Sequence, residues 1–269
     1  MTRIGQLFRR THSQGRSALI AYLTAGDPNP GRTVGLVRAL QRGGADLIEL
    51  GVPFSDPIAD GPVIQRAADR ALRAGITMRK VLDIAKAIRS ESDIPLVLFT
   101  YLNPALRYGF DKLGSDAAAA GIDGCLLTDL SVEEAEHYGD VTRTNGLDTV
   151  FLAAPTSTDR RLELVAKYSS GFVYLVSRTG VTGEQSTVGT AAAELVRRMR
   201  CFTSLPLAVG FGISTPEQVA SVGAIADGVV VGSALVRTIE RYGAEPTLEE
   251  EVEQFTRGLA GGLARKAAQ

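Results

Sequence analysis

The segment Gly44-Ala45-Asp46-Leu47-Ile48-Glu49-Leu50 places a glycine and an aspartate directly before a short apolar run. Glycine often ends a helix, because it adopts the left-handed backbone conformation without strain. The same arrangement recurs at Gly121-Ile122-Asp123 and at Gly146-Leu147-Asp148. We therefore expect a repeated unit in which a helix ends at a glycine and a strand follows directly.

Short apolar runs recur along the whole chain, and most are apolar at consecutive rather than alternating positions. This pattern is typical of parallel strands that are buried on both faces. The expected strands are residues 19–24, 46–50, 95–100, 123–127, 148–153, 172–177, 206–209 and 227–231.

Segments with helical spacing lie between these runs; residues 192–199, for example, carry apolar side chains at i, i+3, i+4 and i+7. Eight strands in 269 residues give about 33 residues per unit, the size of a βα unit. The sequence predicts an α/β fold, a (β/α)8 TIM barrel that forms a single domain over residues 1–269. An extra N-terminal helix is expected near residues 2–11 and a last helix near 248–265. An open doubly wound sheet is the alternative. In a barrel, the active site lies on the loops that follow the strands.

Composition narrows the function classes. Apolar residues make up 45% of the chain and charged residues 22%, with a formal net charge of −1. We therefore expect a globular protein that binds neither nucleic acid nor a membrane surface. No apolar run approaches the roughly 18 residues that span a membrane. The two cysteines, Cys125 and Cys201, are too few for a disulfide framework or a cysteine zinc site, and they favour a reducing, cytoplasmic location.

The second expected strand, residues 46–50, carries a carboxylate, Glu49, between apolar neighbours. Glu49 shares a strand face with Leu47, near the strand's end. Burial without a partner raises the pKa of a carboxyl group, which suits a general acid or base near neutral pH. A structural ion pair is the alternative. Asp60 and Asp56 follow in a loop stiffened by prolines, where a helix-cap role is equally compatible with the sequence.

Glycine-rich loops follow three of the later strands. Residues 210–214 and Gly232-Ser233-Ala234 follow the seventh and eighth strands, where barrels frequently bind phosphate through backbone N–H groups. Tight turns with no ligand are the alternative. The polar segment 177–187, with two glycines, is a candidate lid over the site or a surface loop without a catalytic role.

Other chemistries lack the residues they need. Each of the five lysines lies away from an expected strand end, which argues against a Schiff-base aldolase. His137 reads as helix surface and His12 lies in the polar segment before the first strand, so no histidine metal cluster is expected. The sequence therefore favours metal-free carboxylate chemistry on a phosphorylated substrate.

Four motifs, in order, resemble those of the tryptophan synthase alpha chain family, and the resemblance covers essentially the whole chain. They are residues 22–28, 177–183 and 210–214, together with the long and specific Leu47-Ile48-Glu49-Leu50-Gly51-Val52-Pro53-Phe54-Ser55-Asp56-Pro57-Ile58-Ala59-Asp60-Gly61-Pro62. The resemblance implies a lyase of L-tryptophan biosynthesis, which splits indole-3-glycerol phosphate into indole and glyceraldehyde 3-phosphate by a retro-aldol reaction. It implies neither a metal nor a cofactor on this chain.

The resemblance also implies roles for individual residues. Glu49 would shuttle protons at indole C3 and the side-chain hydroxyl, while Asp60 would balance the charge at the indole nitrogen. The substrate would contact Tyr22, Phe99, Tyr101, Leu126, Thr128, Tyr174 and Thr182, with Thr182 holding Asp60 and Tyr174 near Glu49. The phosphate would be held by Gly183, Phe211, Gly212, Gly232 and Ser233. Pro53, Asp56 and Pro57 would face a beta chain that carries pyridoxal phosphate, in an α2β2 tetramer.

Two positions depart from the family pattern, and other functions remain open. Ser131 stands where proline is usual, in a loop over the site, and Tyr22 stands where phenylalanine is common, which predicts a slightly more polar pocket. The alternatives are a stand-alone indole-releasing lyase of the same family, a non-catalytic relative that activates a beta chain, and another phosphate-binding barrel such as a sugar-phosphate isomerase. The intact Glu49, Asp60 and Thr182 argue against the non-catalytic relative.

Overall fold

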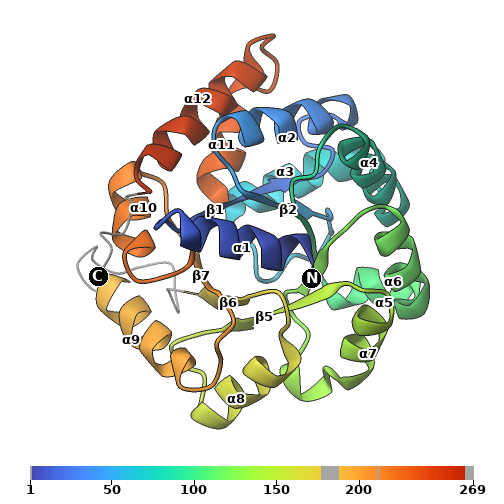
Figure 1. The fold of residues 1–269 in the computed structure, drawn as a ribbon. Helices are drawn as coiled ribbons and strands as arrows, with labels where there is room; N and C mark the ends of the chain where they lie inside the picture. Colours follow the sequence, from blue (N-terminus) through green and yellow to red (C-terminus); the bar gives the residue numbers. More distant parts are fainter. Residues whose placement is uncertain (1, 177–187, 211, 264–269) are drawn as a thin grey trace.

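The structure, a computed structural model, describes residues 2–176, 188–210 and 212–263. Its parallel strands form a closed barrel in sequence order, in which β1 also pairs with β8 (Figure 1). The strands are β1 (Ala18–Thr24), β2 (Leu47–Gly51), β3 (Leu96–Thr100), β4 (Gly124–Leu127), β5 (Asp148–Ala153), β6 (Val173–Val176), β7 (Leu207–Gly210) and β8 (Gly228–Val231). The predicted barrel is confirmed and the open doubly wound sheet is wrong. The expected end of the sixth strand, Ser177, lies outside the described residues.

Helices surround the barrel. They are α1 (Arg3–Ser13), α2 (Thr33–Arg42), α3 (Pro62–Arg73), α4 (Met78–Glu91), α5 (Leu102–Tyr108), α6 (Phe110–Ala119), α7 (Glu136–Thr144), α8 (Asp159–Tyr168), α9 (Val188–Arg200), α10 (Pro216–Gly223), α11 (Ser233–Tyr242) and α12 (Leu248–Gly261), with short 3-10 turns η1 (Pro30–Arg32) and η2 (Val132–Glu134). The helix α1 runs two residues further than expected, so that His12 lies in its last turn rather than in a polar segment.

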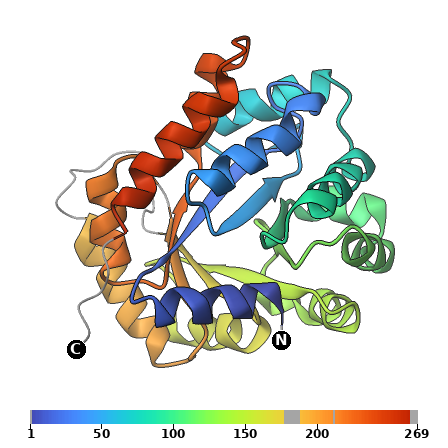
Figure 2. The ribbon, with the colours of Figure 1, turned by 45° about the horizontal axis from the view of Figure 1, so that its top comes forward.

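The helix α1 closes one end of the barrel (Figure 2). Its residues Ile4, Leu7 and Phe8 pack among inward-facing strand residues, and the Phe8 ring lies 5.7 Å from that of Phe172, which directly precedes β6. This is the end where the strands begin. Packed side chains fill it, so the opposite end, where the strands finish, is left for chemistry.

The repeated glycine–aspartate junctions join each strand to its neighbour. Gly44, Gly121 and Gly146 have φ angles of +104°, +80° and +69°, which confirms their role at the helix ends. At the first two junctions, the aspartate that follows clamps the start of the preceding strand with both its backbone and its side chain. Asp46 donates its backbone N–H to the Leu19 carbonyl at 2.8 Å and accepts the Leu19 N–H on Oδ2 at 2.9 Å. Asp123 clamps the N-terminal residue of β3 in the same way.

We expect Asp46→Ala to lower the free energy of unfolding by about 3 kcal/mol, measured by urea denaturation. The carboxylate is buried and accepts two hydrogen bonds from Arg16, at 2.7 and 2.8 Å. The substitution therefore removes both hydrogen bonds from Arg16 to Asp46 and leaves the Leu19 N–H without its side-chain acceptor. Asp93→Ala is the matched control, because Asp93 is 93% exposed and its ion pair with Arg3 is 3.6 Å long. Equal losses from both variants would contradict the clamp.

Candidate active site

Glu49 lies inside the barrel near the end of β2. It aligns with Tyr22 of β1 and Val97 of β3, and its side chain is only 1% exposed. Its Oε1 atom has no hydrogen-bond partner among the described residues. Burial raises the pKa of Glu49 to about 8. The carboxyl group is therefore mostly protonated at neutral pH and can donate a proton to a ligand.

Asp60 lies in the loop between β2 and α3, next to Tyr101. Burial raises its pKa to about 6, and a hydrogen bond from the Tyr101 hydroxyl opposes that rise. The same hydroxyl accepts the Ala59 backbone N–H at 3.1 Å, so that Tyr101, directly after β3, anchors the loop. At neutral pH Asp60 is mostly ionised while Glu49 is mostly protonated. Two carboxyl groups with separated pKa values can divide the roles of acid and charge stabiliser.

Two buried tyrosines flank the carboxyl groups. Burial raises the pKa of Tyr22 and of Tyr174 well above the usual value, and the charges of Asp60 and Glu49 add to the rise in both. The Tyr22 hydroxyl lies 3.2 Å from the Thr24 Oγ1 atom, and its ring meets that of Phe99 edge-on at 5.1 Å. The structure therefore brings these predicted site residues together around Glu49.

A glycine makes room for each of these phenols. A Cβ atom on Gly51 would lie 2.3 Å from the Tyr22 hydroxyl, and one on Gly210 would lie 2.3 Å from the Tyr174 hydroxyl. Each glycine ends its strand, β2 or β7. The sequence marked both positions as parts of motifs, but only the side-chain packing assigns them this role. A glycine at the end of a strand, beside a strand that carries an inward tyrosine, is the signal that could have found them.

The residues expected to hold phosphate gather after β7 and β8. Gly212 is exposed with a φ of +77°, whereas Gly232 caps the start of α11 and Ser233 is its first residue. A Cβ atom on Gly232 would lie 3.6 Å from the Tyr22 Cβ atom. The N-terminus of α11 therefore borders the pocket that contains Glu49 and Asp60. The predicted residues Thr182, Gly183 and Phe211 lie outside the described residues, as does the candidate lid 177–187.

The two remaining predicted pocket residues lie on and after β4. Leu126 is fully buried inside the barrel. Thr128 is half-buried, and its hydroxyl donates to the Thr100 carbonyl at 3.2 Å. Hydrogen bonding to Thr128 also lowers the pKa of Tyr101, which places Thr128 beside the group that holds Asp60. Burial is the largest influence on Tyr101 and raises its pKa overall.

The loop expected to face a partner exposes an apolar side chain that the sequence analysis did not single out. Ile58 is 83% exposed, and Leu106 on the neighbouring α5 is 54% exposed. Of the predicted interface residues, Asp56 is exposed, Pro57 half-buried and Pro53 buried. Apolar side chains that form an exposed patch are a feature of interaction surfaces.

Ser131 occupies a backbone position that would also accept proline. Its φ is −66°, within the range that a proline ring imposes. The hydroxyl binds the Glu133 carboxylate and lowers its pKa. Serine therefore keeps the φ that proline would have at this position, and it adds a local hydrogen bond at the start of η2.

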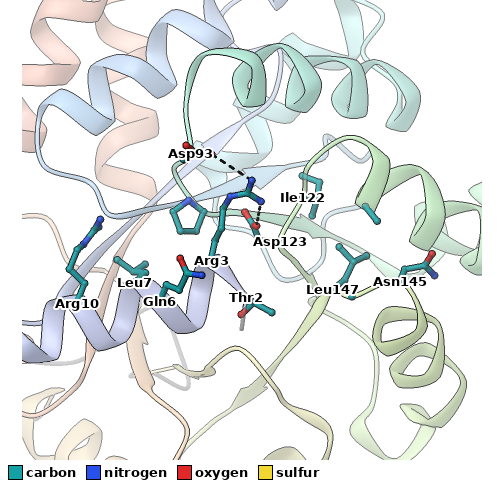
Figure 3. Close-up of a pocket in the computed structure, with 13 residues that line it drawn as sticks. Thr2, Arg3, Gln6, Leu7, Arg10, Asp93, Ile122, Asp123, Asn145 and Leu147 are labelled. Atoms are coloured by element: carbon teal, nitrogen blue, oxygen red, sulfur yellow. Dashed lines mark hydrogen bonds and ion pairs between the residues drawn. The ribbon is translucent and has the colours of Figure 1, made fainter.

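A cavity of about 760 Å³ lies at the opposite end of the barrel from Glu49, beneath α1 (Figure 3). Its charged groups are already paired: Arg3 contacts Asp123 at 3.1 Å and Asp93 at 3.6 Å. We therefore assign no chemistry to it. Among the described residues, no cluster of three His, Cys, Asp or Glu side chains could hold a metal ion. In the same part of the chain, no helix has the length and apolar character needed to cross a membrane.

Carboxyl groups at the mouth of a closed (β/α)8 barrel place the chain among barrel enzymes built for acid–base chemistry. A family model described as tryptophan synthase alpha chain matches residues 8–264. The chain belongs to the tryptophan synthase alpha chain family, and it is accordingly a lyase of tryptophan biosynthesis.

Relatives and solved structures agree over nearly the whole length. The tryptophan synthase alpha chain of Solibacter usitatus is 65% identical, over 99% of this chain and 100% of its own. A tryptophan synthase structure from Mycobacterium tuberculosis has a TM-score of 0.89 at 40% identity, covering 97% of this chain and 98% of that one. The alpha subunit from Legionella pneumophila has a TM-score of 0.90 at 37% identity, covering 97% and 98%.

Proposed function

We propose that the protein cleaves indole-3-glycerol phosphate to indole and glyceraldehyde 3-phosphate. The observation that carries this proposal is the buried, protonated Glu49, whose Oε1 atom lacks a partner among the described residues. A substrate atom that needs a proton would supply that missing partner. The pairing with an ionised Asp60 fits a reaction in which positive charge develops on a neighbouring ring nitrogen.

The proton steps balance around Glu49. The protonated carboxyl group gives its proton to C3 of the indole ring, and the ring nitrogen becomes a cation that Asp60 stabilises. The Glu49 carboxylate then takes the proton of the side-chain hydroxyl. The bond from C3 to that carbon breaks, its electrons neutralise the ring nitrogen, and an aldehyde forms. Glu49 ends protonated, ready for another turnover. Each such proton transfer typically contributes about 10²–10⁴ in rate.

We infer that the phosphate end is held by Gly212, Gly232 and Ser233 together with Gly183 and Phe211. In support, Ser233 begins α11, and the first backbone N–H groups of a helix attract anions. The chain would need no cofactor of its own, because protonation of C3 creates the electron sink for the bond cleavage. We place the protein in the cytoplasm, since its two cysteines suit a reducing compartment.

We also propose a beta chain as partner, in an α2β2 assembly whose pyridoxal phosphate belongs to that chain. In support, Ile58 and Leu106 lie exposed at the mouth of the site, and the Tyr101 hydroxyl joins the Ile58 loop to the residues beside α5. A partner seated here would touch the loop that carries Asp60. This contact offers a direct route from partner binding to catalysis.

We expect Ile58→Asp to weaken partner binding at least tenfold while the basal activity of the isolated chain stays within about twofold. The side chain is 83% exposed, so the isolated chain loses little packing. A beta-chain titration that follows the acceleration of indole release measures the effect. Ala87→Asp is the matched control, because it places the same charge on an exposed residue of α4 near Arg89, which binds Gly121 at the opposite end of the barrel. It should leave the titration unchanged. An unchanged titration for Ile58→Asp would remove this loop from the interface.

The pH dependence of kcat/KM should be bell-shaped, with limbs near pH 6 and pH 8. Activity rises as Asp60 loses its proton and falls as Glu49 loses the proton that it must donate. Steady-state rates across this range check the expectation. In Asp60→Asn the acidic limb should disappear while the alkaline limb stays. A profile without an alkaline limb would contradict the acid role of Glu49.

The deciding experiment is indole release from indole-3-glycerol phosphate by the purified chain, with and without a tryptophan synthase beta chain. The chain contains no tryptophan, so it adds no tryptophan fluorescence to the indole signal. Slow release that the partner accelerates supports the proposal. Fast release that the partner leaves unchanged indicates a stand-alone lyase. No release in either condition overturns the proposed reaction.

A further inference from the structure

One half-buried guanidinium links three segments that lead into the site. Arg70 on α3 donates from Nε to Asp27 Oδ1 at 2.7 Å and from Nη2 to Asp27 Oδ2 at 3.1 Å. Its Nη1 donates to Glu240 Oε1 on α11 at 2.7 Å. Asp27 lies in the loop after β1 and is only 1% exposed. Arg70 therefore connects the β1 loop, α3 and α11 through a single side chain.

The two helices carry the two ends of the candidate site. The helix α3 begins two residues after Asp60, and α11 begins with Ser233 (Figure 1). Beneath the charged groups, Ala67 of α3 and Val236 of α11 pack with Tyr22 of β1 in a separate apolar cluster. The ion pairs and this cluster together fix the distance between the carboxylate end and the phosphate end.

The stability of the fold does not explain why a charge is buried here. Burial is the largest influence on Asp27 and raises its pKa, even though Arg70 opposes that rise. A buried ion pair is often no more stabilising than apolar residues of similar volume, and its better-attested role is to fix one geometry among several. By contrast, Arg66 binds the same Glu240 at a more exposed position and does not reach Asp27.

We propose that Arg70 is a positioning residue, which anchors both α3 and α11 to Asp27 of the β1 loop and thereby sets the spacing between the Asp60 loop and the Ser233 helix, so that one substrate engages both. This inference rests on the proposed function, in which the indole ring meets Glu49 and Asp60 while the phosphate meets Ser233. Linking two binding ends in one molecule increases affinity only when the site holds them at the matching distance. A change in spacing should therefore affect the linked substrate far more than its separate parts.

The test compares Arg70→Met with Arg66→Met in the full-length chain. Both substitutions remove a guanidinium that binds Glu240, but only Arg70→Met releases α3 from the β1 loop. We expect Arg70→Met to raise the KM for indole-3-glycerol phosphate about tenfold. The dissociation constants of indole and of glycerol 3-phosphate, each measured alone by calorimetry, should stay within about twofold. Arg66→Met should leave all three values unchanged within the same margin.

The unpaired Asp27 carboxylate could lower the melting temperature of Arg70→Met or prevent its folding. The double variant Asp27→Asn/Arg70→Met removes that buried charge, so it should fold and still show the raised KM. An unchanged KM, or equal losses for the linked substrate and both fragments, would overturn the positioning role. A wild-type chain that releases no indole would overturn the proposed function and this inference with it, whereas an active wild type with an unaffected Arg70→Met would overturn this inference alone.

Discussion

Replacement of Glu49 by glutamine should reduce kcat by about 10²–10⁴ while the protein becomes more stable near pH 8. Glutamine has nearly the same shape but carries no transferable proton, so neither protonation of C3 nor removal of the hydroxyl proton can proceed. Stopped assays of indole release from indole-3-glycerol phosphate measure the loss. The KM should change little, because Glu49 is buried inside the barrel and keeps its packing.

The gain in stability follows from the direction of the pKa shift. The pKa of Glu49 rises from 4.5 to about 8 on folding. Its contribution to stability is complete below pH 4.5 and is lost as the pH rises to about 8. Each pKa unit corresponds to about 1.36 kcal/mol, so Glu49→Gln should gain on the order of 4 kcal/mol near pH 8 and nothing near pH 4.5. Urea denaturation at the two pH values measures this difference.

Glu250→Gln is the matched control, because Glu250 is exposed on α12 and undergoes the same chemical change away from the site. It should alter neither the rate nor the pH dependence of stability. A Glu49→Gln variant that keeps the wild-type kcat would exclude Glu49 as the proton carrier. A variant with unchanged stability at both pH values would show instead that the carboxyl group is ionised or paired in the folded protein.

The barrel could be predicted from the sequence because its signals are local. A glycine that ends a helix and an apolar run buried on both faces depend on neighbouring residues alone, and strand ends therefore agree closely with the structure. The clamp made by Asp46 could not be predicted in this way. Its acceptor role depends on Leu19 and Arg16, which come from a strand and a loop distant in the sequence.

The carboxyl group of Glu49 could also be placed from the sequence, since strand alternation fixes the face on which it lies. The sequence could not predict that the Glu49 Oε1 atom has no hydrogen-bond partner among the described residues, because this depends on side chains from every strand around it. The same holds for Arg70, which reads as an ordinary helix-surface arginine until the β1 loop and α11 are brought beside it. Long-range contacts therefore decide which charged residues matter.

Gly210→Ala should reduce activity at least 100-fold while most of the stability of the fold remains. The new Cβ atom would lie 2.3 Å from the Tyr174 hydroxyl and 2.8 Å from its Cζ atom, distances that no packed structure tolerates. Tyr174 must therefore move from its position near Glu49. Overpacking of this kind typically costs about 1–3 kcal/mol of stability. Indole release and urea denaturation separate the two effects.

A second substitution, at Tyr174, tests whether the clash with the phenol causes the loss of activity. In Gly210→Ala/Tyr174→Phe the atom at 2.3 Å is gone but the one at 2.8 Å remains, so recovery should be partial. In Gly210→Ala/Tyr174→Leu both tyrosine atoms are gone, and the contact that remains is the Val230 Cβ atom at 3.0 Å. Activity should therefore approach that of Tyr174→Leu alone. Non-additivity is the expected result for residues in contact. If the double variants lose the sum of both single effects, the phenol is not what the glycine accommodates, and Gly210 must act instead through the loop that follows β7.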